Sequence, residues 1–328
     1  MRKVTSFFIC LFVSALFVMK VDAETKIAVI GKTKNDSFYE TAFNGCEEFA
    51  QNKDLKCIYD GALDFQDPRG QVKAIKNILD QNVDGILLST TDSNVLVERI
   101  LPLVQIRGIP LMTFDSDLLP YHSDHRLAYI GTNNFDFGVA LGEYAKKLKK
   151  GDFTQICIQS GSSTTPNLNK RVEGVRFALS GNKSNKKLTG ENGWIEHRRC
   201  PFYTLGKQER ALKQLEFLLE EGPQTIYLAV AGFAQFSPNY IERILPYQDR
   251  IKSGELVIIS ADAEDVQLDA LRENLSTVNI GQRPFEMGRY GAELLYDVIK
   301  NNRRPDKEIN YLGFYYCTEN NGVQCSLD

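Results

Sequence analysis

Short apolar segments alternate with longer amphipathic segments along almost the whole chain. Residues 26–30 form a compact run rich in β-branched residues that ends at Gly31, and apolar residues then recur at helical spacing from Phe38 to Ala50. Strands that alternate with amphipathic helices indicate parallel sheets with helices on both faces. We therefore predict an α/β protein with doubly wound parallel sheets.

The same strand-helix unit repeats in both halves of the chain. Further strands are predicted near residues 56–59, 85–89, 111–114, 128–131, 155–159, 194–198, 225–230 and 256–260. Further helices are predicted near residues 67–81, 93–107, 136–149, 169–180, 206–221, 238–253 and 264–272. The 328 residues are about twice the length of a typical domain. Because no linker divides them, we predict two Rossmann-like lobes joined by short crossings.

The first residues have the layout of an export signal. Arg2 and Lys3 precede an apolar run over residues 7–19, and small residues precede Glu24. This layout predicts a cleavable signal peptide over residues 1–23 and a mature chain that starts at Glu24. The apolar run is shorter than an ordinary transmembrane helix, so an uncleaved anchor is the weaker alternative.

Export places the cysteines in an oxidising compartment. Removal of the signal peptide takes away Cys10 and leaves six of the seven cysteines, which can pair in 15 ways. Pairing of sequence neighbours predicts the disulfides Cys46–Cys57, Cys157–Cys200 and Cys317–Cys325. Buried free thiols are the alternative, and a zinc site is disfavoured because no Cys-x-x-Cys pair occurs.

Several function classes are disfavoured by charge and by incomplete motifs. The 39 Lys and Arg residues nearly balance 42 Asp and Glu, so the basic excess of a nucleic-acid-binding protein is missing. Residues 31–33 resemble the end of a P-loop but lack its first glycine, and a dinucleotide fingerprint fails at the same turn. Residues 161–165 begin like a nucleophile elbow without its final glycine. His122 and His125 lie in a polar, loop-like segment, and we predict neither a metal nor a cofactor.

Polar side chains recur where the predicted strands end. Asp36, with the aromatic residues Phe38 and Tyr39, follows the first strand, while Asp115 and Asp262 each follow a later one. Carboxylates accept hydrogen bonds from hydroxyl groups, and aromatic faces cover the apolar face of a sugar ring. Ligands of open α/β sheets bind at the carboxyl ends of strands, so the pattern favours a small polar ligand such as a sugar. For each residue alone, a helix N-cap or turn is the alternative.

Six short segments between about Lys26 and Leu312 carry a family resemblance. They are Asn35-Asp36-Ser37-Phe38-Tyr39 with Gly45, Thr113-Phe114-Asp115, Tyr129-Ile130-Gly131-Thr132-Asn133-Asn134 with Gly138, Arg171-Val172-Glu173-Gly174, Ser260-Ala261-Asp262, and Gln282-Arg283-Pro284 with Gly288. Together they resemble the periplasmic sugar-binding proteins of the type I fold, the ribose-binding-protein-like receptors of ABC importers. The sequence departs from this family at Ser116 and at Ala231, so the resemblance does not imply a pentose.

The resemblance implies a non-enzymatic receptor that closes two lobes on its ligand. The implied lobes are residues 24–133 with 283–311 and residues 134–282 with 312–328. Hinge crossings are expected near Asn133-Asn134, near Asp262-Ala263 and near Gln282-Arg283-Pro284. Ligand contacts are expected at Asp36, Phe38, Tyr39, Asp115, Asn133, Arg171, Tyr203, Asp262 and Gln282.

A membrane partner in the periplasm is also implied by the resemblance. It is either the permease of an ABC importer or the periplasmic domain of a sensor kinase. No nucleic acid is expected as a partner. An exported α/β hydrolase is a rival from another class, which the incomplete motifs disfavour.

Overall fold

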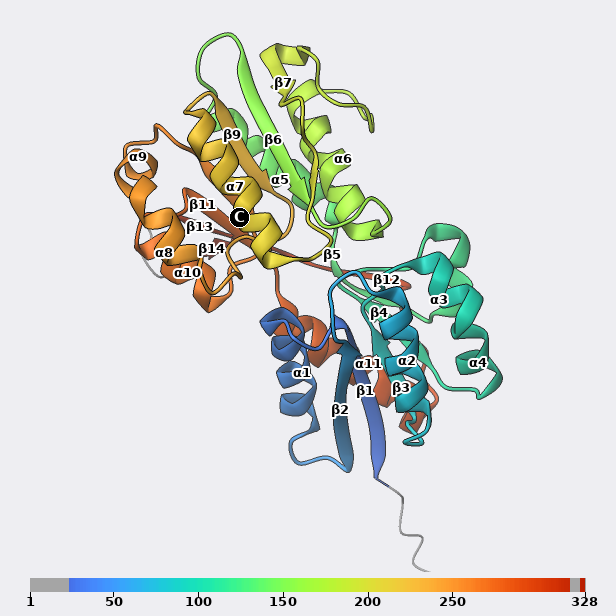
Figure 1. Cartoon of the computed structure of the whole chain (residues 1–328). Helices are drawn as coiled ribbons and strands as arrows, with labels where there is room; N and C mark the ends of the chain where they lie inside the picture. Colours follow the sequence, from blue (N-terminus) through green and yellow to red (C-terminus); the bar gives the residue numbers. More distant parts are fainter. Residues whose placement is uncertain (1–23, 319–324, 328) are drawn as a thin grey trace, which may run out of the picture.

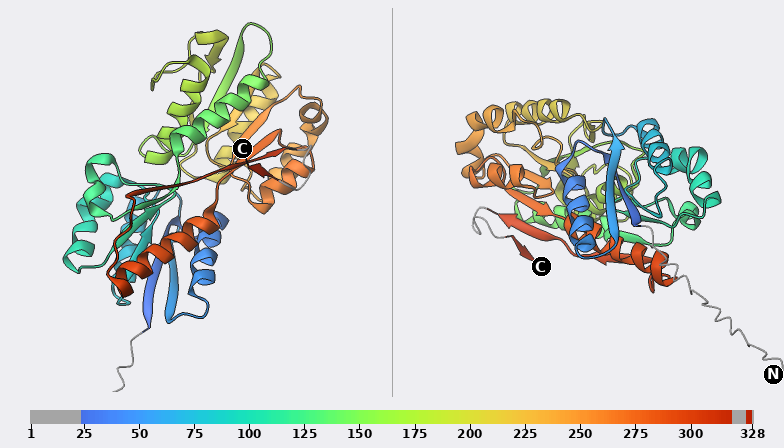
Figure 2. Two further views of the ribbon diagram at one scale, coloured as in Figure 1. Left: turned by 180° about the vertical axis from the view of Figure 1, so that it is seen from behind. Right: turned by 90° about the horizontal axis from the view of Figure 1, so that it is seen from below.

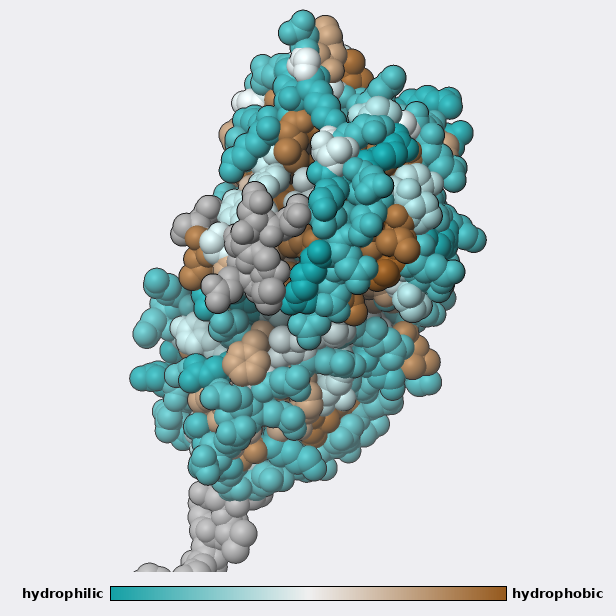
Figure 3. Space-filling model, turned by 90° about the vertical axis from the view of Figure 1, so that its left-hand side faces the viewer, coloured by the Kyte–Doolittle hydropathy of each residue, from teal (hydrophilic) through white to brown (hydrophobic). Residues whose placement is uncertain are grey.

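The structure is a computed structural model that describes residues 24–318 and 325–327, so the predicted signal peptide lies outside the described residues. The chain forms two lobes, each with its own sheet (Figure 1). The face seen in Figure 3 is mostly hydrophilic, with apolar side chains in small scattered groups. Within the described residues, no helix combines the length and the apolar character that a membrane crossing requires.

The first lobe is built on a sheet with the strand order β12-β5-β4-β3-β1-β2. Its strands are β1 (Thr25–Thr33), β2 (Leu55–Ala62), β3 (Gly85–Leu88), β4 (Leu111–Phe114), β5 (Tyr129–Thr132) and β12 (Ile309–Leu312). All of these pairings are parallel, as predicted. Strands β3, β4 and β5 are buried throughout, which fits a sheet covered on both faces.

Helices cover both faces of this first sheet. They are α1 (Ser37–Ala50), α2 (Pro68–Leu79), α3 (Ser93–Arg99), α4 (Leu101–Ile106) and α11 (Pro284–Asn301). Alternate residues of β1 serve the two faces: Ile27 packs in the cluster with α1 and α11, and Ala28 packs in the cluster with α2, α3 and α4. Gly288 lets α11 approach α1 closely, because a Cβ there would lie 1.7 Å from the carbonyl oxygen of Ala42.

The second lobe is built on a sheet with the strand order β14-β13-β11-β10-β9-β6-β7, and a further strand, β8, pairs with β6. The strands are β6 (Thr154–Ser160), β7 (Trp194–Glu196), β8 (Phe202–Tyr203), β9 (Thr225–Ala229), β10 (Ile258–Ala261), β11 (Val278–Gly281), β13 (Tyr315–Thr318) and β14 (Ser326–Leu327). Strands β13 and β14 pair antiparallel, unlike the parallel pairing predicted throughout. Strand β13 follows β12 after only Gly313 and Phe314, so no crossover helix intervenes to make it parallel to β11.

The helices of the second lobe also flank its sheet (Figure 1). They are α5 (Asn134–Lys147), α6 (Pro166–Ser180), α7 (Gln208–Glu221), α8 (Tyr240–Ile244), α9 (Gln248–Lys252) and α10 (Asp265–Arg272). Trp194, at the start of β7, is buried in the core of this lobe.

Two predicted helices are interrupted in the structure. The helix predicted over residues 93–107 is divided into α3 and α4 at Ile100, just before Pro102. The helix predicted over residues 238–253 is divided into α8 and α9 by a 3₁₀ turn over Leu245–Tyr247, which contains Pro246. A proline lacks the N–H group that would continue an α-helix, which accounts for both interruptions.

The chain passes between the two sheets at three places in the described residues. It passes from β5 to α5, from β11 to α11, and from β12 to β13, the last as a long ribbon visible in Figure 2. The expected crossing near Asp262-Ala263 is wrong, because β10 before it and β11 after it both belong to the second sheet. The β12–β13 connection provides the remaining crossing.

Three disulfides brace the lobes locally. Cys46–Cys57 joins α1 to β2 with Cα atoms 6.2 Å apart. Cys157–Cys200 joins β6 to the turn after β7 at 5.4 Å, and Cys317–Cys325 joins β13 to the residue before β14 at 4.4 Å. These pairs are the ones that sequence-local pairing predicts. Cys200 itself lies just after the predicted strand near residues 194–198, outside any strand.

Candidate functional site

A small cavity lies between the two lobes, at the carboxyl ends of strands from both sheets. It has a volume of about 40 Å³. Its lining combines charged, amide and aromatic side chains from Lys32, Asp36, Phe38, Tyr39, Phe65, Gln66, Asp115, Asn167, Leu168, Arg171, Phe233, Phe236, Asp262 and Gln282. The structure thus brings Asp36, Phe38, Tyr39, Asp115, Arg171, Asp262 and Gln282 of the predicted set together at one place.

Asp115 is the centre of the hydrogen bonding on the first-lobe side. It directly follows β4 and has a φ of +56°, a left-handed conformation that aspartate tolerates better than most residues. Its carboxylate accepts hydrogen bonds from Ser89 Oγ at 2.8 Å, Tyr39 Oη at 3.1 Å and Asn167 Nδ2 at 3.1 Å. Burial opposes its charge, but the nearby charges of Lys32 and Arg171 outweigh burial and lower the pKa of Asp115.

Lys32 supplies a buried cation from the end of β1 and is only 4% exposed. Its Nζ lies 3.3 Å from Asp115 and donates a hydrogen bond of 3.0 Å to Asn167 Oδ1 on α6. Burial lowers the pKa of Lys32, and the charge of Asp115 opposes that shift. The sequence prediction missed both Lys32 and Asn167.

Arg171 joins the cavity to the hinge. From α6, its guanidinium donates to Asn134 Oδ1 at 2.8 Å, to the carbonyl oxygen of Val230 at 2.9 Å and to Gln282 Oε1 at 2.8 Å. It also lies over the ring of Phe137, with its central carbon 4.7 Å from the ring centre. Asn134 and Gln282 lie at two of the lobe crossings, so hydrogen bonds from Arg171 connect these two crossings.

Asp262 presents a second buried carboxylate, this time from the second lobe. It follows β10 with a φ of +70°. One oxygen accepts a 2.8 Å hydrogen bond from Gln282 Nε2, and the other accepts a 3.2 Å hydrogen bond from the backbone N–H of Gly232. Burial raises the pKa of Asp262 despite the opposing charge of Arg171.

The start of α1 brings an acid and aromatic rings to the cavity. Asp36 is the N-cap of α1 and accepts a 3.0 Å hydrogen bond from the backbone N–H of Phe38. Burial raises the pKa of Asp36 to about 7.

An aromatic contact joins the two lobes across the cavity. Phe65 of the first lobe meets Phe233 of the second lobe edge to face, with ring centres 5.3 Å apart. The interlobe aromatic contact comes from a pair that the sequence prediction did not contain.

Two predicted ligand residues do not line this cavity. Asn133 caps α5, with its side chain accepting from the N–H groups of Phe135 and Asp136. It faces a separate interlobe cavity of about 500 Å³. Tyr203 lies on the short strand β8 and is 37% exposed, and Phe233 and Phe236 supply the second-lobe aromatic rings instead.

The residues that the sequence prediction missed carry weak signals. Lys32 lies at the end of the first apolar strand, but a lysine at a strand end is ordinarily exposed, so its position alone did not place it in the site. Gln66, Phe233 and Phe236 lie in irregular segments without periodicity, so nothing in the sequence pattern placed them at the site.

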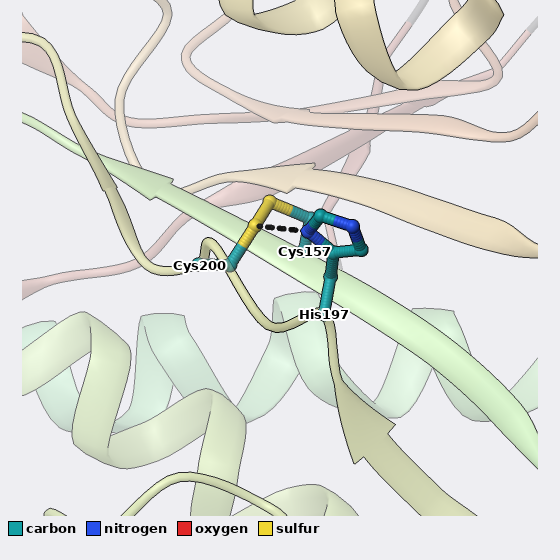
Figure 4. A group of neighbouring side chains, drawn as sticks. All are labelled: Cys157, His197 and Cys200. Atoms are coloured by element: carbon teal, nitrogen blue, oxygen red, sulfur yellow. Dashed lines mark hydrogen bonds between the residues drawn. A yellow bond between two sulfur atoms is a disulfide. The ribbon is translucent and has the colours of Figure 1, made fainter. Parts of the chain in front are cut away.

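One group in the described residues has the ligand types of a metal site, namely Cys157, His197 and Cys200 (Figure 4). The two sulfurs form a disulfide, so neither offers a thiolate to a metal. His197 Nδ1 lies 3.7 Å from Cys200 Sγ, and its Nε2 lies 3.0 Å from Glu221. The group is therefore a core disulfide beside a hydrogen-bonded histidine.

Comparisons with known proteins agree with this architecture. Residues 27–303 match the family model described as the periplasmic binding protein domain. An ABC transporter solute-binding protein from Agrobacterium vitis, bound with α-D-tagatopyranose, is 22% identical with a TM-score of 0.77, covering 90% of this chain and 95% of that one. One from Burkholderia graminis, in complex with D-arabinose, is 23% identical with a TM-score of 0.76, covering 92% and 97%.

A third similar structure comes from Bacillus halodurans and contains myo-inositol. It is 18% identical with a TM-score of 0.71, covering 92% of this chain and 96% of that one. All three share the fold of two mostly parallel sheets in separate lobes. The match to the family model extends over most of the chain, from β1 to the end of α11. The chain therefore belongs to the periplasmic binding protein family.

Proposed function

We propose that this protein is a periplasmic solute-binding receptor that captures a sugar or related polyol between its lobes and delivers it to an ABC importer. The observation that carries the proposal is the pair of buried carboxylates, Asp115 and Asp262, one from each lobe, at a single cavity. Both follow strand ends, where open α/β sheets bind their ligands.

The chemistry of the lining suits a polyhydroxylated ligand. Carboxylates accept hydrogen bonds from hydroxyl groups, while Arg171 and Gln282 offer N–H donors to ring and hydroxyl oxygens. The rings of Phe38, Phe65 and Phe233 supply faces for the apolar side of a sugar. Polar side chains then fix the orientation of the ligand, and the aromatic rings exclude water.

Lobe motion explains how such a ligand enters a cavity of about 40 Å³. The crossings at β5–α5, β11–α11 and β12–β13 form a hinge at one side of the cavity. Rotation about them opens the cavity to solvent without disturbing either sheet. In the closed form, surfaces of both lobes lie next to each other. A membrane partner can distinguish this arrangement from the open form.

Isothermal titration calorimetry with pentoses, hexoses, cyclic polyols and their amino derivatives tests the capture step. We expect saturable one-to-one binding of at least one of them and recovery of that compound unchanged by chromatography. Absence of binding across the panel contradicts the proposal, and conversion of the bound compound indicates an exported enzyme. For delivery, deletion of the gene should abolish cellular uptake of the bound compound. Retained uptake with loss of a transcriptional response indicates a sensory partner.

A further inference from the structure

The acidic and basic side chains that line the cavity are not paired one to one. Both cations are directed at a single acid, with Lys32 Nζ 3.3 Å and an Arg171 nitrogen 3.7 Å from Asp115. Asp36 and Asp262 line the same cavity, and neither forms an ion pair with any described residue. Two carboxyl groups, one on each lobe, therefore have no described cation at ion-pair distance.

A third acid stands beside them at the lobe interface. Glu264 precedes α10 in the second lobe and accepts a 3.4 Å hydrogen bond from Thr41 Oγ1 on α1 of the first lobe. It too forms no ion pair among the described residues. Burial raises the pKa of Glu264 to about 8, with the charges of Asp262 and Asp36 adding to the shift. The interface thus gathers three carboxyl groups on one side of the cavity.

Aromatic rings line the cavity together with these acids. Phe38 follows Asp36 closely on the first lobe, and Phe65 meets Phe233 across the lobes. The face of an aromatic ring carries a partial negative charge, which attracts an ammonium group that is removed from water. A neutral sugar would use the ring faces but would leave the acids unbalanced. A ligand carboxylate would add a further negative charge to the same enclosed space.

We infer that the captured solute carries a protonated amine, so that it is an amino sugar or an amino polyol bound through Asp36, Asp262 and the surrounding rings. This inference rests on the proposed function. An ammonium group satisfies the acids with charge-assisted hydrogen bonds, which are stronger than those to neutral donors. The hydroxyl groups of the same ligand remain available to Asp115 and Gln282.

Calorimetry with matched ligands tests the inference on the intact mature protein. Each set contains a neutral sugar or inositol, its analogue with one hydroxyl replaced by an amine, and the N-acetylated form of that analogue. We expect at least one amine to bind about tenfold more tightly than its neutral parent, a difference typical of one added charged hydrogen bond. Acetylation should remove that advantage because it removes the charge.

The possible outcomes separate this inference from the proposed function. Neutral parents that bind as tightly as every amine overturn the inference and leave the proposed function intact. Tighter binding of matched uronates than of amines also overturns it. If neither the sugars and polyols nor their amines bind, the proposed function itself is wrong.

Substitution of the unpaired acids locates the effect. Asp36→Asn keeps an N-cap, because asparagine caps helices about as well as aspartate. We expect the affinity ratio of amine to neutral parent to fall at least about fivefold in Asp36→Asn or Asp262→Asn, since each removes one of the attracting charges. Asp92→Asn is the matched control, since Asp92 caps α3 away from the cavity through a hydrogen bond from Val95 N–H. An unchanged ratio in both cavity variants contradicts the inference.

Discussion

Lys32 of the first lobe donates a 3.0 Å hydrogen bond to Asn167 of the second lobe, and Asn167 in turn donates a 3.1 Å hydrogen bond to Asp115 of the first lobe. These two contacts cross the lobe interface inside the cavity and are buried. The side chains of Thr165 and Gln66 add a further hydrogen bond between the lobes. The closed arrangement therefore has polar contacts of its own, apart from those that a ligand would add.

Lys32→Met should shift the ligand-free protein toward an open arrangement. The substitution removes the cross-lobe donor, and a hydrogen bond to a charged group contributes about 1.5–3 kcal/mol. We expect a larger radius of gyration by small-angle X-ray scattering. Lys34→Met is the control, because Lys34 is exposed near the same strand end. Identical scattering of Lys32→Met and the unaltered protein would contradict a role in closure.

Asp115→Asn and Asp262→Asn should each weaken ligand binding about ten- to 150-fold, the range for the loss of hydrogen bonds to a charged acceptor. Asparagine tolerates the left-handed backbone that both positions adopt, so the loops should keep their shape. Calorimetry measures the loss, and thermal unfolding verifies that the variants are folded. Unchanged affinity in both variants would remove these two carboxylates from the site.

Rising pH should favour the open arrangement. Burial raises the pKa of Asp36 from its ordinary 3.8 to about 7, and that of Glu264 from 4.5 to about 8. Between the ordinary and the raised values the closed form binds more protons than the open form, so its stability falls as pH rises toward 8. The pKa of Asp36 also depends on the charges of Asp262, Asp115 and Lys32. The pKa of Glu264 also depends on the charges of Asp262 and Asp265.

Small-angle scattering of the ligand-free protein between pH 6 and pH 9 measures this effect. We expect the radius of gyration to increase with pH in the unaltered protein. The increase should be smaller in the double variant Asp36→Asn/Glu264→Gln, which has neither titrating acid. A radius that decreases with pH, or an equal increase in both proteins, contradicts the assignment.

Removal of the Cys157–Cys200 disulfide should destabilise the protein more than removal of Cys317–Cys325. The first closes a separation of 43 residues and the second a separation of 8. Loss of the constraint on the unfolded chain corresponds to about 4 kcal/mol for the long loop and about 2.5 kcal/mol for the short one. Chemical denaturation of the two paired alanine variants compares these losses, and a larger loss for the short loop would refute the ranking.

Local sequence patterns predicted most of the strands and helices of the fold, but not all of them. Strand β11 was missed because Asn279 interrupts its apolar run. That asparagine is buried and satisfied by hydrogen bonds with its sequence neighbour Ser276, with Gln235 and with the carbonyl oxygen of Asp262. Only the folded chain brings the last two partners near. Antiparallel β13 was missed because it depends on the return of the chain across the lobe interface.

The site residues, too, could be predicted only where the signal lies in the local sequence. Asp115 and Asp262 could be identified because a carboxylate directly after an apolar strand is a local signal. Lys32 could not, because a lysine is ordinarily exposed, and its burial depends on Asp115 and Asn167 from distant segments. Asn133 has the same kind of local signal but serves as a helix cap, which sequence alone does not distinguish from a ligand contact.

Native mass spectrometry of the mature protein, purified from the cells that export it, tests the central claim most directly. The unaltered protein should retain one small molecule whose released mass corresponds to a sugar or polyol or to an amino derivative. The double variant Asp115→Asn/Asp262→Asn, purified in parallel, should carry none of it. A bound molecule of another chemical class, or equal retention of the same molecule by both proteins, would contradict sugar capture between Asp115 and Asp262.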